Sequence, residues 1–269
     1  RSLFDTHRRT AEVKGPREAA DREHFNSIAD GYAAKDLAPS SRIARRHRLD
    51  RTLAAVPADT FERVLEVGCG AGFGADYLRG RFEDYVGIDH SRRLIEVAIE
   101  KNSGTGVRFE ASSIDGYDPP HRFDLIVMIG VLHHLEDPAR SMETMVPWLE
   151  PGGYLVANEP QPANPLIRAA RQARTRFDAS YSSEQEEFRD AELRALFEVA
   201  GLEGISITPQ GLVSTPFSEL VLKPYAVTTP LARIACAVDG LIERRSGPWL
   251  GAFSWNLIGC GRAPTSSKG

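Results

Sequence analysis

The sequence contains few of the residues that cross-link small secreted domains. Its 269 residues include three cysteines, Cys69, Cys236 and Cys260, and none of them forms a CxxC pair or stands beside a histidine at ligand spacing. A disulfide framework or a zinc site is therefore not expected, and a reducing, cytoplasmic compartment is the simpler interpretation. No acidic cluster has the spacing of metal ligands either, so we expect no bound metal.

Long apolar runs and excess positive charge are missing as well. No unbroken apolar run approaches the roughly 20 residues of a membrane-spanning helix. The first residues are polar and lack the apolar core of a signal peptide. Whether residues precede Arg1, which is not a methionine, is left open. The formal net charge of −4 argues against nucleic acid as a partner, because domains that bind it are usually basic.

What the sequence does contain is a regular alternation of apolar and amphipathic segments. Strand-like runs are followed by helical stretches at about 73–81, 91–102 and 138–149. The runs fall at 63–67, 85–88, 107–110, 123–129 and 154–159. Strands separated by helices predict parallel βαβ units, and runs that are apolar on both faces predict a sheet covered on both sides. The fold class is therefore α/β, with a doubly wound sheet.

The remaining segments divide the chain further. Residues 1–16 are predicted to be disordered, 17–58 to form an N-terminal helical lid, 59–262 to form the main domain, and 263–269 to be a loose tail. Helical insertions are expected at about 160–185 and 209–250, and a final strand at 253–261.

A glycine-rich loop follows the first strand of the main domain. Gly68, Gly70, Gly72 and Gly74 lie between that strand and a helix, where glycines let the backbone turn tightly and approach a ligand. Glu66, two residues earlier, suits a cationic ligand and would repel a pyrophosphate. The looser spacing of Gly70, Gly72 and Ala75 nevertheless keeps a dinucleotide open as an alternative.

An acidic residue follows at the end of the next strand. Asp89 lies 21 residues beyond Gly68, and a carboxylate there can accept hydrogen bonds from both hydroxyls of a ribose. The alternative is that Asp89 caps the helix at 91–102, although Ser91 is available for that role.

Taken in order, EVGCGAGFG, VGID, FDLIVMIGVLHHLEDP and LEPGGYLV resemble the class I S-adenosylmethionine-dependent methyltransferases, and among them the ubiquinone- and menaquinone-biosynthesis-like group. The resemblance covers about residues 60–210 and includes Phe25, Ala29 and Tyr32 ahead of them. It implies a Rossmann-like sheet of seven strands, mostly parallel, with the last strand inserted antiparallel. It also implies N-terminal helices, a helical cap and S-adenosylmethionine as cofactor, leaving as S-adenosylhomocysteine.

The resemblance also assigns cofactor-binding roles to individual residues. The backbone of Gly68, Cys69 and Gly70 would pass the methionine and ribose. Glu66 would orient the loop or reach the amino group through water. Asp89 would take the ribose hydroxyls and His90 would stack near the adenine. Where the family has a Gly-Asp pair this chain has Ser112-Ser113-Ile114, so Ser113 or the backbone would serve the adenine. Ile129 and Gly130 would lie against the cofactor, and Tyr32 would close over its methyl-donor end.

Two residues are candidate general bases. His134 follows the strand at 123–129 and Glu159 ends the strand at 154–159, at the edge where open α/β sheets bind ligands. A hydroxyl acceptor needs a base, and histidine, with an unperturbed pKa of about 6.5, suits that task. The alternatives are that His134 packs the loop and that Glu159 is exposed or pairs with an arginine of the insertion.

Two basic segments and one apolar segment have no assigned role. Arginines crowd 42–51 and recur at Arg168, Arg171 and Arg174. They suit an anionic substrate or an acidic membrane surface. The preferred interpretation is a solvated face whose arginines pair with the acids at 184–192. In the 209–250 insertion, apolar residues recur at Leu231, Ile234, Ala235, Val238 and Leu241. Core packing is expected there, with a hydrophobic substrate, a bilayer or a dimer as alternatives.

We therefore predict methyl transfer to a small or medium-sized acceptor, anionic or apolar, with an oxygen nucleophile of a metabolite or natural product preferred. A C- or N-methyltransferase acting on a quinone, lipid or sugar intermediate is the first alternative. An NAD(P)-dependent oxidoreductase or a non-catalytic cofactor-binding protein is the alternative from another class. Membrane-surface contact is not favoured, and the sequence leaves the oligomeric state unknown.

Overall fold

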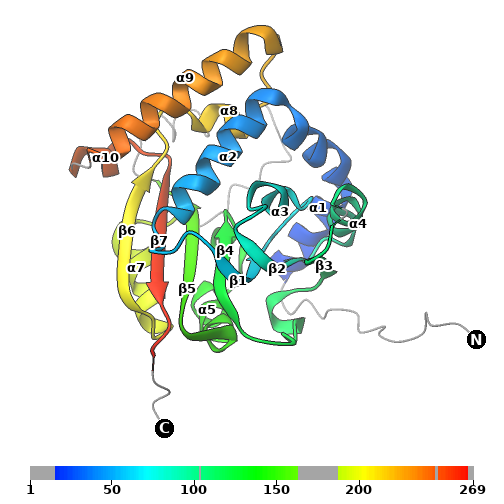
Figure 1. The fold of residues 1–269 in the computed structure, drawn as a ribbon, viewed down its shortest axis with the longest axis vertical. Coiled ribbons are helices and arrows are strands. Elements are labelled where there is room, and N and C mark those ends of the chain that lie inside the picture. Colours follow the sequence, from blue (N-terminus) through cyan, green and yellow to red (C-terminus); the bar gives the residue numbers. More distant parts are fainter. Residues whose placement is uncertain (1–15, 103, 163–186, 246–247, 266–269) are drawn as a thin grey trace, which may run out of the picture.

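The protein is built on a sheet of seven strands (Figure 1). The computed structural model describes residues 16–102, 104–162, 187–245 and 248–265. The strands are β1 (Phe61–Val67), β2 (Phe82–Asp89), β3 (Val107–Ala111), β4 (Phe123–Ile129), β5 (Leu149–Pro160), β6 (Glu203–Gln210) and β7 (Asn256–Arg262).

The strand order is β3-β2-β1-β4-β5-β7-β6. The pairs β1–β2, β2–β3, β1–β4 and β4–β5 are parallel, and β7 is antiparallel to both β5 and β6. The predicted doubly wound α/β fold is confirmed, including the antiparallel last strand. The order reverses between β1 and β4, and the carboxyl ends of strands at such a switch point form a crevice for ligands.

Apolar side chains cover both faces of this sheet. On one face, Met142 and Met145 pack with Leu193 and Phe197 against the strands. On the other, Leu49 and Leu53 pack with Tyr77 and Leu78. These side chains come from helices on opposite sides, which is why the central strands carry continuous apolar runs.

The described helices match most of the predicted helical stretches. They are α1 (Pro16–Leu37), α2 (Pro39–Leu53), α3 (Phe73–Tyr77), α4 (Arg92–Lys101), α5 (Pro138–Met145), α7 (Asp190–Val199), α8 (Thr215–Glu219), α9 (Tyr225–Glu243) and α10 (Pro248–Phe253). Short 3₁₀ turns occur at η1 (Ile114–Gly116), η2 (Leu132–His134) and η3 (Val146–Trp148). Ser91 caps α4 by accepting from the amide of Leu94, and Asp137 caps α5 by accepting from that of Arg140.

The two predicted insertions have different outcomes. Most of the first, including the predicted basic helix with Arg168, Arg171 and Arg174, lies outside the described residues. The second contains α8, α9 and α10, between β6 and β7. In Figure 1, α9 lies along the outer edge of the molecule, beside α2.

Core packing was the expectation for the apolar residues of α9, and it is largely wrong. Ala235 is buried, but Leu231, Ile234, Val238 and Leu241 are exposed. By length and composition alone, α9 is also apolar enough to cross a membrane, although the sequence has no unbroken apolar run of that length.

Candidate active site

The loop after β1 is shaped by glycines that take left-handed backbone angles. Gly68 has φ of 71° and Gly70 has φ of 53°. A side chain on Gly68 would overlap that of Val131 from the loop after β4, and a Cβ on Gly70 would lie 3.6 Å from Tyr32 Cε1. Contact with Val131 therefore excludes a side chain at Gly68, and the left-handed backbone angle disfavours one at Gly70, where the loops after β1 and β4 meet beneath helix α1.

Asp89 joins this loop to the next one along the sheet edge. One carboxylate oxygen accepts the Gly70 amide at 3.0 Å, and the other accepts the Ser91 amide at 2.8 Å. Burial raises the pKa of Asp89, although His90 and these two amides oppose the shift. Each oxygen keeps a further lone pair, so the carboxylate can still accept hydrogen bonds from a ligand.

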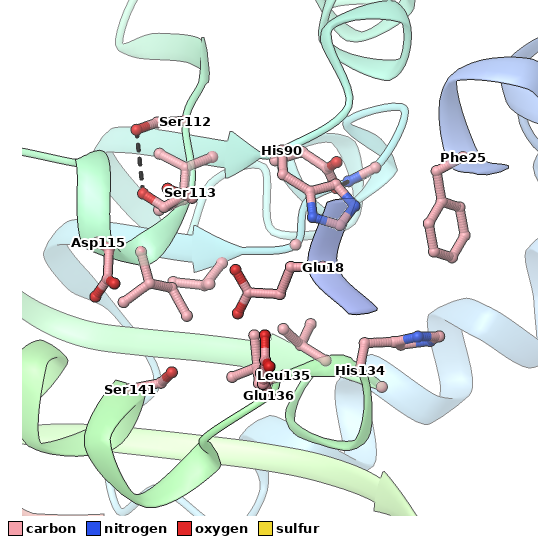
Figure 2. Close-up of a pocket in the computed structure, with 18 of the residues that line it drawn as sticks. Glu18, Phe25, His90, Ser112, Ser113, Asp115, His134, Leu135, Glu136 and Ser141 are labelled. Atoms are coloured by element: carbon pink, nitrogen blue, oxygen red, sulfur yellow. Dashed lines mark hydrogen bonds between the residues drawn. The ribbon is translucent and has the colours of Figure 1, made fainter. Parts of the chain in front are cut away.

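Between these loops lies a pocket of about 310 Å³, within the range of small-molecule sites of about 300–1,000 Å³. Figure 2 shows Ser112, Ser113, Asp115 and Ser141 at one end, and His90, Phe25 and His134 at the other. Glu18 reaches between the two ends from the first turn of α1. Helix α1 thus forms part of the wall.

Acidic side chains predominate in the pocket. The carboxylates are those of Glu18, Asp89, Asp115, Glu136 and Asp137. Among the described lining residues the one arginine is Arg140, which lies 3.9 Å from Asp115. A wall of this charge attracts a ligand that carries a sulfonium and an ammonium and repels a pyrophosphate.

Most of the predicted cofactor-binding residues line this pocket. They are Tyr32, Gly68, Gly70, Asp89, His90, Ser113, Ile114, Ile129 and Gly130. The Ser113 hydroxyl is buried and has no hydrogen-bond partner within the described part of the chain. A buried polar atom of this kind is an expected partner for a ligand.

Glu66 and Cys69 do not line the pocket. Glu66 lies beneath the glycine loop, where it accepts a hydrogen bond from the Tyr85 hydroxyl and packs against Gly74. Burial raises its pKa to about 7. Of its two predicted roles, the position fits orientation of the loop and not contact with the cofactor. The Cys69 side chain is buried against Gly87 of β2.

The two candidate bases lie in different environments. His134 lines the pocket, and its Nδ1 lies 3.0 Å from Asp21 Oδ2 of α1. Burial opposes ionisation of Asp21, but the hydrogen bond and charge of His134 outweigh it and lower the pKa of that carboxyl. The carboxylate favours the tautomer with the proton on Nδ1, which leaves Nε2 as the basic nitrogen.

Glu159 is not placed to act as a base. It is fully buried, and its oxygens accept the amides of Val131 and Leu132 and contact His133 Nδ1 at 2.8 Å. Burial works against its ionisation, but His133 and these amides lower its pKa. Glu159 therefore anchors the loop after β4, and its predicted catalytic role is corrected on that ground.

Arginines of α2 lie beyond the Tyr32 and Gly130 end of the pocket. Arg48 donates from Nε to Asn158 Oδ1 at 2.9 Å, and its Nη2 lies 3.9 Å from where a Cβ on Gly130 would be. Arg45 pairs with Asp36 and lies 5.3 Å from the centre of the Tyr32 ring. Arg45 and Arg48 thus have partners within the fold, and among the described residues these do not include the acids at 187–192. The other predicted partners, at 184–186, lie outside the described residues.

The sequence interpretation missed Glu18 and Asp21 of α1 and the lining residues that follow η2. Glu18 and Asp21 precede Phe25 by seven and four residues, and Tyr32 follows it by seven, so all four lie on one helical face. That periodicity was a usable signal. Glu136, Arg140 and Ser141 left no comparable signal, because only their position after η2 brings them to the pocket.

Comparison with known proteins is consistent with this geometry. The family model described as a methyltransferase domain matches residues 41–207. Phosphoethanolamine N-methyltransferase 1 of Arabidopsis thaliana is 34% identical over 102 residues, which is 36% of this chain and 21% of that protein. Ubiquinone biosynthesis O-methyltransferase of Thiobacillus denitrificans is 33% identical over 98 residues, 35% of this chain and 42% of that protein. The match therefore spans less than half of either relative.

A solved structure extends the likeness to the whole fold. N-methyltransferase NodS from Bradyrhizobium japonicum, in complex with S-adenosyl-L-homocysteine, has a TM-score of 0.55 and 19% identity. The alignment covers 92% of this chain and 99% of that one.

Proposed function

This chain belongs to the methyltransferase domain family, and we propose that it is an S-adenosylmethionine-dependent methyltransferase that methylates an oxygen nucleophile, with His134 as general base. The acceptor is a small or medium-sized metabolite or natural product. The observation that carries the proposal is the pairing of His134 with Asp21 in the wall of the acidic pocket.

The described residues fit the cofactor. The carboxylates around the pocket match its two positive charges, and Asp89 has lone pairs for the ribose hydroxyls. The unpartnered Ser113 hydroxyl is available to the adenine. When bound, S-adenosylmethionine supplies a methyl group on a positively charged sulfur that a correctly aligned nucleophile can attack.

The placement of His134 favours an oxygen acceptor. Its ring packs against Phe25, which in turn packs against Tyr32, so it lies toward the Tyr32 end of the pocket. Asp21 leaves Nε2 free to accept the proton of a hydroxyl as the oxygen takes the methyl group. An amine attacking through its lone pair has less need of such a base.

The names of the relatives leave this choice open, because one is an N-methyltransferase and another an O-methyltransferase. The half-buried Arg48 beyond Gly130, which also lies 3.7 Å from Glu219, adds an electrostatic preference. A cation there favours an acceptor that carries or develops negative charge, such as a phenol or an acidic hydroxyl.

The test is turnover of phenol, alcohol, carboxylate and amine acceptors, measured as S-adenosylhomocysteine formed. We expect turnover on hydroxyl acceptors, and a loss of about 10²–10⁴-fold in kcat for His134→Ala, as is typical of a removed general base. Asp21→Asn should lower kcat and shift the pH profile, while cofactor affinity stays near the wild-type value.

The matched control is His121→Ala, at a histidine that pairs with Asp84 away from the pocket. If His134→Ala keeps the wild-type kcat on the true acceptor, His134 is a packing residue and not the general base. Turnover confined to amines would leave the methyltransferase assignment in place and reject the oxygen acceptor.

A further inference from the structure

Helix α9 has two faces of different chemistry. Its inward face is buried against α2 and the loop after β6, and a Cβ on Gly240 would contact His47 of α2. The buried residues are Thr228, Ala232, Ala235, Cys236, Asp239 and Glu243. The helix is therefore held firmly along one side.

The outward face carries a continuous apolar stripe. Val227, Leu231, Ile234, Val238 and Leu241 recur at alternating spacings of four and three residues, and they are 52%, 48%, 59%, 37% and 62% exposed. Exposed apolar residues scattered singly need no explanation, but five in register on one helix mark an interaction surface.

Charge is sorted between the two faces. The segment 220–245 contains two acids, Asp239 and Glu243, and both are turned inward and buried. Asp239 accepts the amides of Leu212, Val213 and Ser214, and Glu243 accepts the Gly211 amide and pairs with Arg51 at 2.6 Å. The exposed charges of the segment 220–245 are therefore all positive.

These cations border the apolar stripe. Lys223 precedes the helix, Arg233 lies within it, and Arg244 and Arg245 follow its last turn; all four are exposed. Within the described part of the chain, no carboxylate pairs with any of them. An apolar stripe bordered by lysine and arginine is the chemistry of a helix that lies in the interface of an anionic bilayer.

We propose that the outward face of α9 docks onto an anionic phospholipid surface, with the helix parallel to the membrane. Insertion across the bilayer would break the bonds of Asp239 and Glu243. A second copy of the same face would set cation against cation, with no exposed acid on either helix. The lipid surface supplies both an apolar layer and the negative charge that α9 lacks.

Docking in this way would bring the acceptor side of the pocket close to the bilayer. Helix α9 packs on α2, and α2 supplies Arg45 and Arg48 beside the Tyr32 and Gly130 end of the pocket. Such docking favours an amphipathic or lipid-dissolved acceptor. This preference rests on the proposed function, whereas the docking of α9 does not depend on it.

The test is co-sedimentation of the full chain with phosphatidylcholine vesicles, with and without phosphatidylglycerol. We expect binding only to the anionic vesicles, lost in the triple variant Leu231→Ser, Ile234→Ser, Leu241→Ser. Each cation is worth roughly fivefold in partitioning, so Arg244→Gln with Arg245→Gln should weaken binding about 30-fold, and high salt should do the same.

Ile99→Ser on α4 is the matched control, because Ile99 is 56% exposed and lies far from α9 in the chain. It should bind as wild type does, and every variant should keep its circular dichroism spectrum and its affinity for S-adenosylhomocysteine. Absence of binding to anionic vesicles, or equal binding by the triple variant, would overturn the proposal. So would a wild-type dimer in light scattering that the triple variant abolishes, since the face would then bind a second copy.

Discussion

The two halves of the carboxyl edge of the sheet are stabilised in different ways. Over β1, β2 and β4, the loops are short turns whose glycines and Asp89 lie within a few residues of the strand ends. Over β5, β6 and β7, buried carboxylates connect distant segments: Glu159 holds residues 131–133, and Asp239 holds residues 212–214.

The two halves therefore contribute to different properties of the protein: the first to cofactor binding and the second to the stability of the fold. In the first half, Asp89 accepts two amides and still lines the pocket, whereas Glu159 and Asp239 in the second half accept buried amides and do not line it. Changes in the residues of the first half that line the pocket should therefore alter cofactor affinity more than folding, and changes in the buried acids of the second half should do the reverse.

The largest expected effect is on cofactor binding by Gly70→Val. The backbone at Gly70 has φ of 53°, and a Cβ there would point toward Tyr32 across the pocket wall. A branched side chain would occupy the space that the cofactor needs. We expect no measurable heat of S-adenosylhomocysteine binding in calorimetry, from a protein that still melts cooperatively.

Asp239→Asn provides the opposite case. Leu212, Val213 and Ser214 would lose a charged acceptor in a buried site, which should cost about 1–3 kcal/mol of stability. Its affinity for S-adenosylhomocysteine should be unchanged. If Gly70→Val binds normally, or if Asp239→Asn loses binding while folded, the division between the two halves is wrong.

The same division explains how far the sequence interpretation reached. Strands were predictable because β4 and β5 carry the continuous apolar runs of a sheet covered on both faces, and Asp89 because it ends the run of β2. Glu159 lies at the end of β5 and was taken for a base, because nothing in the sequence indicates that residues 131–133 need an acceptor. The stripe on α9 was taken for core because periodicity identifies an apolar face but not what covers it.

The next prediction concerns pH and the Glu66 carboxyl beneath the glycine loop. Burial raises the pKa of Glu66 from its ordinary value of 4.5 to about 7. The fold therefore favours the protonated form, so this contribution to stability is complete below pH 4.5 and is lost as pH rises through 7. At about 1.4 kcal/mol for each pH unit, the loss is about 3 kcal/mol.

Glu66→Gln removes this titration. Its free energy of unfolding, from urea denaturation between pH 4.5 and 8, should overtake that of the wild type as pH rises. Other titrating groups are common to both proteins and cancel in the difference. Glu110→Gln, at an exposed position, is the matched control for the loss of one carboxylate. Parallel curves for wild type and Glu66→Gln would mean that Glu66 is ionised in the fold.

The smallest expected effects are those of Ser113→Ala, which should change ligand affinity and stability in opposite directions. The Ser113 hydroxyl lines the pocket, is buried and has no partner among the described residues, so the unliganded protein carries an unsatisfied polar atom. Ser113→Ala should therefore raise the melting temperature without cofactor.

If the Ser113 hydroxyl bonds to the adenine, the same change should lower affinity by about 2- to 12-fold, the equivalent of one neutral hydrogen bond of about 0.5–1.5 kcal/mol. Asp89→Ala, which removes a charged acceptor, should lower affinity more, by about 10- to 150-fold. Calorimetry with S-adenosylhomocysteine and thermal melts of the same samples measure both quantities. If Ser113→Ala is stabilised but binds S-adenosylhomocysteine normally, the adenine is bound by the backbone and not by this hydroxyl. If Ser113→Ala is destabilised, the hydroxyl already has a partner in the free protein.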